Sequence, residues 1–171
     1  MSTIQKLSLK NINIDLKDNL IGNISRNLFM KTIQDERIDL YDVNAPYIVL
    51  IFWDPSCSHC LEEIPKIKKT YDDIWKAFDI KIFAVNINED LNEGWKKIIK
   101  QENLEDWINV YPSDTVTGSY TQEDVDFQTL FNVHQTPVLY LLDANKKIIA
   151  KKVGFEKYID IIKNIGSVAS E

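Results

Sequence analysis

One stretch of the chain, residues 47–65, reads YIVLIFWDPSCSHCLEEIP and leads from a continuous apolar run to a pair of cysteines. The apolar run, Tyr47 to Trp53, is rich in β-branched and aromatic residues, as expected for a central strand that is covered on both faces. Three polar or turn-forming residues, Asp54-Pro55-Ser56, end it. Apolar residues three or four apart then predict an amphipathic helix: Leu61, Ile64, Ile67, Tyr71, Ile74 and Phe78. Cys57 is therefore expected where a buried strand turns into a helix.

The two cysteines, Cys57 and Cys60, are spaced C-x-x-C and are the only ones in the chain. They are too few for a disulfide framework and supply half of a four-cysteine zinc site. A helix N-terminus presents unpaired N–H groups and partial positive charge, which lower the pKa of a thiol there. We therefore predict that Cys57 is the exposed attacking thiol and that Cys60, one turn later, is the more buried resolving thiol. His59 stabilises the Cys57 thiolate when its imidazole is protonated, which favours the reduced form of the pair.

The composition excludes several classes of function. The 171 residues carry 20 Lys and Arg against 26 Asp and Glu, a net charge of −6. An acidic chain without a basic cluster is a poor candidate for binding nucleic acid. The longest apolar run, Ala45 to Trp53, is too short for a membrane helix, which needs about 20 residues. The five glycines are scattered and form no dinucleotide, phosphate-loop or GxSxG motif.

The rest of the chain alternates strand and helix patterns in the order β-α-β-α-(β)-α-β-β-α, after a short hairpin. Crossovers between the early strands predict parallel pairing, and the last two strands predict an antiparallel edge. The expected strands are residues 27–32, 37–40, 47–53, 80–87, 107–110, 138–142 and 147–153. The expected helices follow Cys60, run from about residue 91 to 103, lie near residues 125–131, and span Phe155 to Ile165 with Gly166 as the C-cap.

Residues 1–22 alternate apolar and polar side chains with a break in phase. We assign them to an N-terminal extension or to the end of a preceding domain, and residues 23–171 to a single α/β domain. The first six residues contain no apolar core of a signal peptide. Two alternatives follow, a cytosolic protein or a fragment of an exported one.

This element order, with C-x-x-C at the first strand-to-helix turn, resembles the thioredoxin fold, so residues 23–171 are expected to form a thioredoxin-like domain. Three features resemble thioredoxin's Phe-Trp pair, helix proline and cis-proline loop: Phe52-Trp53, Pro65 and Thr136-Pro137. The full pattern, Phe-Trp-x-x-x-Cys-x-x-Cys-x-x-Glu-x-Pro, is closer to the extracytoplasmic TlpA/ResA-like thiol–disulfide oxidoreductases.

The resemblance implies a central mixed β-sheet flanked by helices, with an N-terminal β-hairpin extension in residues 27–40 and an insertion in residues 88–131. It implies a thiol–disulfide oxidoreductase that exchanges disulfides with client proteins through the Cys57-Ser58-His59-Cys60 redox motif. The cysteine pair would carry the electrons, so no cofactor is expected. The expected partners are client proteins with disulfides or dithiols and a further redox protein. The resemblance also implies a monomer and a periplasmic or membrane-anchored parent protein.

Glu63, three residues after Cys60, stands where the ResA-like group has an active-site acid. The resemblance therefore implies that Glu63 shuttles a proton for Cys60. The alternative is that Glu63 is a solvated helix charge. Glu62 is placed to pair with Lys66 one turn later, whereas Glu63 has Ile67 four residues on.

Thr136 and Pro137 are implied to hold an extended client, and Trp53 to combine core packing with one wall of the active-site surface. Two residues depart from thioredoxin, since Ser56 replaces a tryptophan and Ile51 replaces a buried aspartate. The Ser-His dipeptide between the cysteines is similar to that of oxidising relatives such as DsbA and protein disulfide isomerase. The direction of electron flow therefore stays open.

Three alternatives compete with the redox function. The first alternative is purely structural: Cys57 and Cys60 would be two small buried side chains that happen to lie three residues apart. A non-enzymatic copper- or zinc-binding protein would use Cys57, Cys60 and a histidine, for which His134, three residues before Pro137, is the candidate. A thiol peroxidase ranks last, because the chain has no Thr-x-x-Cys motif and no arginine near the cysteines.

Overall fold

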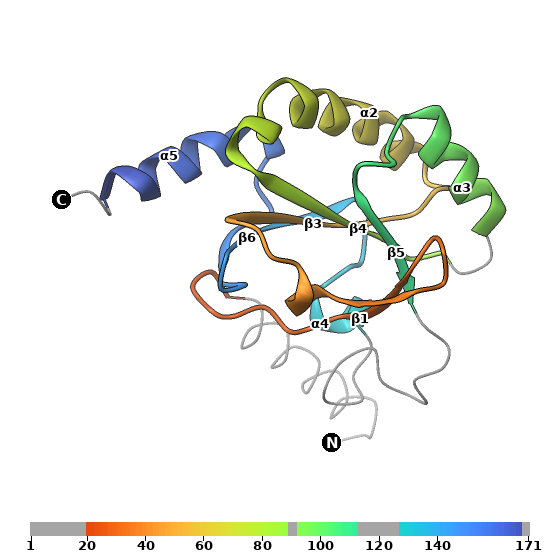
Figure 1. The fold of residues 1–171 in the computed structure, drawn as a ribbon, viewed down its shortest axis with the longest axis horizontal. Coiled ribbons are helices and arrows are strands. Elements are labelled where there is room, and N and C mark those ends of the chain that lie inside the picture. Colours follow the sequence, from red (N-terminus) through yellow and green to blue (C-terminus); the bar gives the residue numbers. More distant parts are fainter. Residues whose placement is uncertain (1–19, 89–91, 113–126, 169–171) are drawn as a thin grey trace, which may run out of the picture.

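The computed structural model describes residues 20–88, 92–112 and 127–168 (Figure 1). Residues 1–19 lie outside these ranges, and with them most of the stretch that we assigned to an N-terminal extension or a preceding domain. The starts of the helices expected near residues 91 and 125 also lie outside the described residues.

A seven-stranded mixed sheet forms the centre of the molecule, in the order β2-β1-β5-β4-β3-β6-β7. Each strand expected from the sequence is present, and its ends differ from the expected ones by no more than two residues. The strands are β1 Phe29–Thr32, β2 Arg37–Asp39, β3 Tyr47–Trp53, β4 Ile80–Asn86, β5 Ile108–Pro112, β6 Val138–Asp143 and β7 Ile148–Lys151.

The central strand β3 pairs in parallel with β4 along its whole length, from Tyr47 opposite Ile80 to Trp53 opposite Asn86. It pairs antiparallel with β6 on its other side. The predicted parallel pairing of the early strands is confirmed, since β4 and β5 are also parallel, and so is the antiparallel β6–β7 edge. Because β3 and β4 end together, the residues that follow Trp53 and Asn86 lie side by side at one edge of the sheet.

The N-terminal hairpin expected in residues 27–40 is confirmed. β1 and β2 are antiparallel, with Phe29 opposite Asp39 and Lys31 opposite Arg37. β1 also pairs antiparallel with β5, so the hairpin lengthens the sheet at its β5 side.

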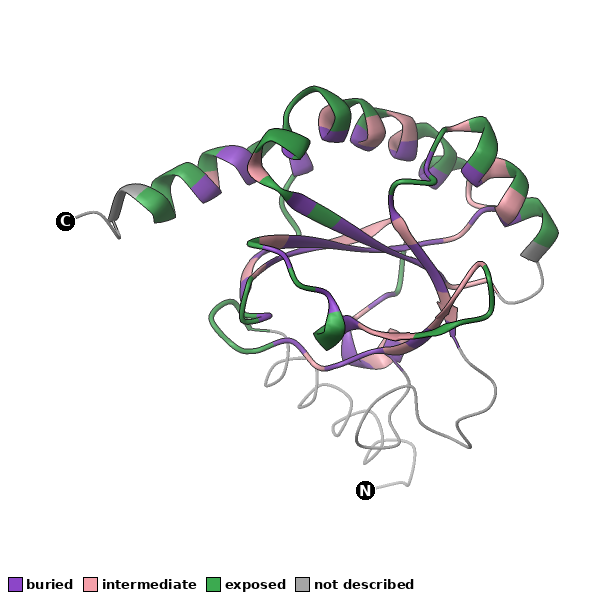
Figure 2. Cartoon of the chain, in the orientation of Figure 1, coloured by how far each residue is buried: buried purple, intermediate pink, exposed green. Residues whose placement is uncertain are grey.

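Helices cover both faces of this sheet (Figure 1). The α-helices are α2 Ser58–Asp73, α3 Asn92–Gln101, α4 Phe127–Leu130 and α5 Tyr158–Val168. Side chains alternate across β3, so Val49, Ile51 and Trp53 pack with residues of α2, α3 and α5 in what we call the helix-side core. The intervening side chains of β3 pack with α4 and the hairpin in the hairpin-side core. Figure 2 shows the buried residues following these two faces, with exposed residues on the outer sides of the helices.

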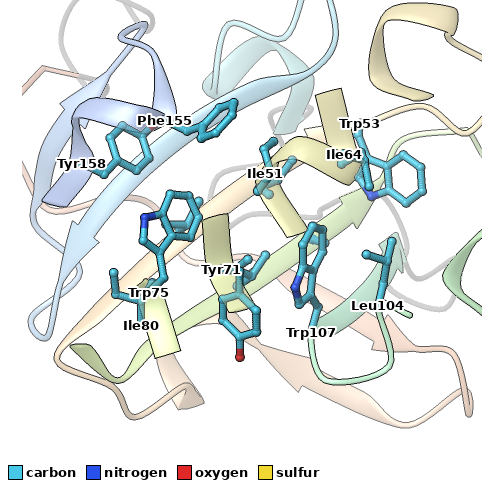
Figure 3. Close-up of a cluster of buried hydrophobic side chains, with 14 of the residues drawn as sticks. Ile51, Trp53, Ile64, Tyr71, Trp75, Ile80, Leu104, Trp107, Phe155 and Tyr158 are labelled. Carbon is cyan, nitrogen blue, oxygen red and sulfur yellow. The ribbon is translucent and has the colours of Figure 1, made fainter. Parts of the chain in front are cut away.

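All four tryptophans belong to the helix-side core and are at most 4% exposed. Trp75 stacks on Tyr158 with ring centroids 5.8 Å apart, and Trp107 meets Tyr71 edge-on at 6.3 Å (Figure 3). The sequence-based assignment of Trp75, Trp95 and Trp107 to packed positions is confirmed. Their fluorescence reports on the core that also contains Cys60.

Three helix details differ from expectation. Leu61 and Ile74 share the spacing of the apolar stripe but are 43% and 44% exposed. Cys60, one residue before Leu61, takes the buried position, and α2 ends at Asp73 before Ile74 can complete the stripe. Gly166 is not a C-cap, because α5 continues past it to residue 168.

An ion-pair network ties the end of α2 to the segment before β5. Lys68 Nζ lies 2.9 Å from Asp72 Oδ1 and 3.0 Å from Asp106 Oδ1. Lys76 Nζ lies 2.6 Å and 2.8 Å from carboxylate oxygens of the same two aspartates. Both ammonium groups also lie within 5.5 Å of the Tyr71 ring centroid. The network therefore stabilises the packing of α2 against the segment that leads into β5.

Replacing Asp106 by asparagine is expected to lower the free energy of unfolding by about 0.5–1 kcal/mol at low salt, since the pairs are partly exposed. Burial raises the pKa of Asp106, but hydrogen bonds from Lys76 and Lys68 outweigh it and lower the pKa overall. The stabilisation is therefore present above the unfolded-state pKa and is lost as the pH falls. Urea unfolding at pH 7 measures it, and the difference should shrink in about 1 M salt. An undiminished difference at high salt would contradict an ionic origin.

Candidate active site

Cys57 lies at the junction of β3 and α2. After Trp53 the chain makes a short turn, which is closed by a hydrogen bond of 3.0 Å from the Cys57 N–H to the Asp54 carbonyl oxygen. Cys57 has extended backbone angles, φ −79° and ψ 118°, and is the N-cap residue of α2, which begins at Ser58. The prediction that the first cysteine lies at a strand-to-helix turn is therefore confirmed.

A segment from far along the chain contacts the Cys57 thiol. The loop before β6 contains a cis peptide bond between Thr136 and Pro137, in agreement with the resemblance to the cis-proline loop. The Cys57 thiol donates to the Thr136 carbonyl oxygen, with Sγ and oxygen 3.7 Å apart. The two segments meet because β3 and β6 are antiparallel neighbours, with Phe52 opposite Val138.

The surroundings of Cys57 favour its thiolate. A hydrogen bond with the Thr136 side chain, distinct from the contact with its carbonyl oxygen, is the largest influence and lowers the pKa of the Cys57 thiol. The N–H groups of Cys60 and His59, in the first turn of α2, lower this pKa further, while burial opposes them. Cys57 is only partly buried, so its sulfur combines a lowered pKa with access for a substrate.

Cys60 lies one turn later and is 0% exposed. It belongs to the helix-side core together with Ile51, Trp53 and Ile64, which are labelled in Figure 3. Burial is the main reason why the pKa of the Cys60 thiol rises to about 11. The prediction that Cys60 is the more buried thiol is confirmed, and the two thiols of the pair have opposite pKa shifts.

Iodoacetamide at pH 7.5 is expected to modify Cys57 first and to leave Cys60 unmodified on the same timescale. A pKa of about 11 leaves roughly one Cys60 in three thousand as thiolate at this pH, and the thiolate is the reactive form. Peptide mass spectrometry after timed quenching measures both sites. In denaturant, where the burial is lost, the two cysteines should react alike. Equal modification of the folded protein would contradict the difference.

Two other predicted residues lie on α2. His59 is exposed on its first turn. Glu63 is partly buried and accepts a hydrogen bond of 2.7 Å from Lys66 Nζ. The prediction that Glu62 is the partner of Lys66 is wrong, because Glu63, three residues before Lys66, makes the ion pair instead. The Glu63 carboxylate is the main reason why the pKa of Lys66 is raised, and Glu62 adds to it through its charge alone.

The expectation that Trp53 forms one wall of an accessible surface is also wrong, because its side chain is 0% exposed. The alternation along β3 directs Trp53 into the helix-side core, on the same side as Val49 and Ile51. Thr136 and Pro137, by contrast, are partly exposed beside Cys57.

His134, the histidine of the metal-site alternative, is exposed in the loop before β6. Within residues 20–88, 92–112 and 127–168, no three His, Cys, Asp or Glu side chains are grouped as metal ligands would be. Cys57, Cys60, His59 and His134 all belong to this described part. The ligand set that the alternative requires is therefore not assembled in this structure.

A hydrogen-bond network before Cys57 was missed by the sequence analysis. Asp54 Oδ1 accepts from the Ser56 N–H and the Ser56 hydroxyl, both at 2.7 Å, and from Asn88 Nδ2 at 3.0 Å. Burial raises the pKa of Asp54, but these hydrogen bonds outweigh it and lower the pKa overall. The Asp-x-Ser spacing is typical of a turn stabilised by its own side chain and was a usable signal. No such signal exists for Asn88, because Asn88 is brought beside Asp54 only by the register of β3 and β4.

Comparison with known protein families matches residues 21–151 to the model of the AhpC/TSA family. The chain belongs to the AhpC/TSA family. The match contains both cysteines, the Asp54 network and the Thr136-Pro137 loop, so the whole candidate site lies in the part that the family shares. A comparison with curated proteins finds no match. In the described part of the chain, no helix is long and apolar enough to cross a membrane.

Solved structures share the thioredoxin-like fold of this family member. A domain of a possible thiol-disulfide isomerase from Cytophaga hutchinsonii is 34% identical with a TM-score of 0.76, over 91% of this chain and 99% of that one. A thiol:disulfide interchange protein from a Bacteroides species is 23% identical with a TM-score of 0.68, over 85% and 89% of the two chains. A thiol-disulfide oxidoreductase from Bacteroides fragilis is 17% identical with a TM-score of 0.66, over 84% of this chain and 99% of that chain.

Proposed function

We propose that this protein is a thiol–disulfide oxidoreductase that exchanges disulfides with client proteins through Cys57 and Cys60. One observation carries the proposal: a partly exposed thiol with a lowered pKa lies one helical turn from a buried thiol with a raised pKa. This asymmetry suits one thiol that attacks and a second that resolves. The similarity to a domain of a possible thiol-disulfide isomerase supports the same class of reaction.

The reaction begins when the Cys57 thiolate attacks one sulfur of a client disulfide. A bond forms between Cys57 and that sulfur, the client S–S bond breaks, and the other client sulfur leaves as a thiolate. Cys60 then loses its proton and attacks the Cys57 sulfur. The Cys57–Cys60 disulfide forms and the second client thiolate is released. The client gains two electrons and the cysteine pair loses two, and the reverse sequence oxidises a client dithiol.

The client is held, in this proposal, by the loop before β6. Thr136 and Pro137 are partly exposed beside the Cys57 sulfur, so an extended client segment placed along them would bring its sulfur to Cys57. His59, exposed on the same turn of α2, would add positive charge near the thiolate when protonated.

The proton of Cys60 needs an acceptor, because burial raises the pKa of this thiol to about 11. We propose Glu63 for this role. It lies three residues after Cys60, which places the two on the same side of α2, and it is only partly exposed. A Glu63→Gln variant would then resolve mixed disulfides more slowly while forming them at the normal rate.

The cellular setting follows from the finer resemblance of residues 52–65 to TlpA/ResA-like proteins. We propose a monomer that needs no cofactor beyond its cysteine pair. Its clients would be proteins with disulfides or dithiols, and a separate redox protein would restore the pair. We further propose a periplasmic or membrane-anchored parent protein. Gel filtration and cell fractionation test the oligomeric state and the location.

The direct test mixes the reduced protein with an equimolar small disulfide protein such as insulin and counts thiols on both partners with time. Loss of two protein thiols with the gain of two substrate thiols is expected. Protein first alkylated at Cys57 serves as the inactive control. The reverse test gives the oxidised protein a reduced protein substrate. Failure to transfer electrons in either direction, or consumption of hydrogen peroxide in preference to the protein disulfide, would refute the proposal.

A further inference from the structure

The Asp54 network lies directly before the redox centre, and the exchange mechanism above does not use it. One carboxylate oxygen, Asp54 Oδ1, receives three hydrogen bonds, from two groups of Ser56 and from Asn88. The network continues into β4, because Asn88 N–H donates to the side-chain oxygen of Asn86 at 2.9 Å. Asn86 is 2% exposed and is the last residue of β4, so the network is anchored in the sheet.

Asp54 stabilises the turn before Cys57 with both its backbone and its side chain. Its backbone carbonyl oxygen accepts the Cys57 N–H at 3.0 Å. Its side chain accepts the N–H of Ser56, the residue directly before Cys57, at 2.7 Å. Asn88 Nδ2 also lies 3.3 Å from the Ser56 hydroxyl oxygen, so the segment that follows β4 contacts both Asp54 and Ser56 of the turn. These bonds leave the peptide before Cys57 little freedom to rotate. Because the orientation of that peptide sets the position of the Cys57 side chain, they also fix the position of its sulfur.

We propose that Asp54 is a positioning residue for the redox centre: by fixing the turn that precedes Cys57 against the segment after β4, it keeps the Cys57 sulfur beside the Thr136 side chain and the first N–H groups of α2. The thiolate depends on these partners, and a turn that rotates would move the sulfur away from them. The proposal rests on the proposed function in taking Cys57 as the attacking thiol.

If Asp54 acts by positioning, its removal should raise the pKa of Cys57, whereas if it acts by its charge, its removal should lower that pKa. A carboxylate near a thiol repels the thiolate, so removing the charge alone would lower the pKa of Cys57. Removing the hydrogen-bond acceptor would instead release the turn and raise that pKa. Asp54→Asn keeps an acceptor oxygen and loses the charge, whereas Asp54→Ala loses both. The other titratable groups nearest to Cys57 along the chain, His59 and Cys60, are unchanged in both variants.

The test measures the rate of iodoacetamide reaction at Cys57 from pH 5 to 10, without any client protein. Asp54→Ala is expected to raise the apparent pKa of Cys57 by about one unit, which is about tenfold slower alkylation near pH 7. Asp54→Asn loses only the charge, so its apparent pKa is expected to stay at the wild-type value or slightly below it. Lower values in both variants would show a charge effect and overturn the proposal, as would unchanged values in both.

Two further variants control the test. Asp106→Asn removes charge near Lys68, which is roughly 16 Å from Cys57 along α2, and should leave the pKa unmoved. If circular dichroism shows that Asp54→Ala does not fold, Asn88→Ala removes one donor of the network while keeping Asp54. An upward shift in Asn88→Ala then supports the proposal and no shift overturns it. A wild-type protein that fails to exchange disulfides would refute the proposed function without changing these alkylation rates.

Discussion

Replacing Cys57 by serine is expected to slow disulfide exchange at least about a thousandfold, equivalent to about 4 kcal/mol in the activation barrier. The reason is the chemistry of the attacking atom, since a thiolate is the nucleophile in exchange and a serine hydroxyl stays protonated at neutral pH. The surroundings cannot compensate, because Thr136 and the N–H groups of α2 stabilise an anion that the hydroxyl does not form.

The measurement is the turnover of a protein disulfide with a regenerating reductant. The matched control is Glu62→Gln, an exposed substitution on the same helix, which should turn over at the wild-type rate. Cys57 is only partly buried, so circular dichroism and tryptophan fluorescence should show an unchanged fold in Cys57→Ser. Turnover within tenfold of the wild-type rate in Cys57→Ser would contradict the assignment of the attacking thiol.

Replacing Cys60 by serine is expected to stop the reaction halfway. Cys57 keeps its lowered pKa through Thr136 and the first turn of α2, so attack on the client still occurs. Without the resolving thiol the mixed disulfide cannot be released inside the protein, and it should accumulate to nearly one client per molecule. Multiple turnover should fall by about a hundredfold or more, which is about 2.7 kcal/mol or more.

Non-reducing electrophoresis and intact-mass measurement detect this complex, and added dithiothreitol should release the client. The Cys57→Ser variant provides the paired control, because it should form no complex under the same conditions. Stability needs checking, since Cys60 is 0% exposed and a buried hydroxyl without a partner costs about 1–3 kcal/mol. A folded Cys60→Ser protein that forms no mixed disulfide would contradict the division of roles between the two cysteines.

The elements of the fold were largely predictable because each follows from a local pattern. The apolar run of β3 and the hydrophobic period of α2 identified a buried strand and an amphipathic helix with the cysteines between them. The parallel order of the early strands followed from their helical crossovers. Errors arose where a local pattern was ambiguous by one position, as at Leu61, which lies next to the buried Cys60 on α2.

The candidate site was less predictable, because it is made by contacts between distant segments. The contact between Cys57 and Thr136 joins residues 79 positions apart, and the resemblance to a known loop was the source of that prediction. Asn88 reaches Asp54 through the register of β3 and β4, which no local pattern encodes. Trp53 was expected to combine core packing with one wall of the active-site surface. Only the core packing is confirmed, because the alternation along β3 buries the whole side chain.

The direction of electron flow depends on how far the reduced form of the pair is stabilised. A lowered pKa at Cys57 stabilises the reduced protein and so makes the disulfide a better oxidant. The raised pKa at Cys60 has no such effect, since this thiol stays protonated at neutral pH. A midpoint potential of about −120 to −180 mV would indicate an oxidase or isomerase, and one near about −270 mV a reductase.

The central claim, that Cys57 and Cys60 form a reversible redox pair, is tested most directly by equilibrating the protein with defined ratios of reduced and oxidised glutathione. Acid quenching, alkylation and mass spectrometry then count the free thiols at each ratio. We expect one two-electron transition in which both thiols disappear together into an intramolecular disulfide. Cysteines that stay reduced at every ratio, or bound glutathione on Cys57 while Cys60 stays free, would contradict a redox pair.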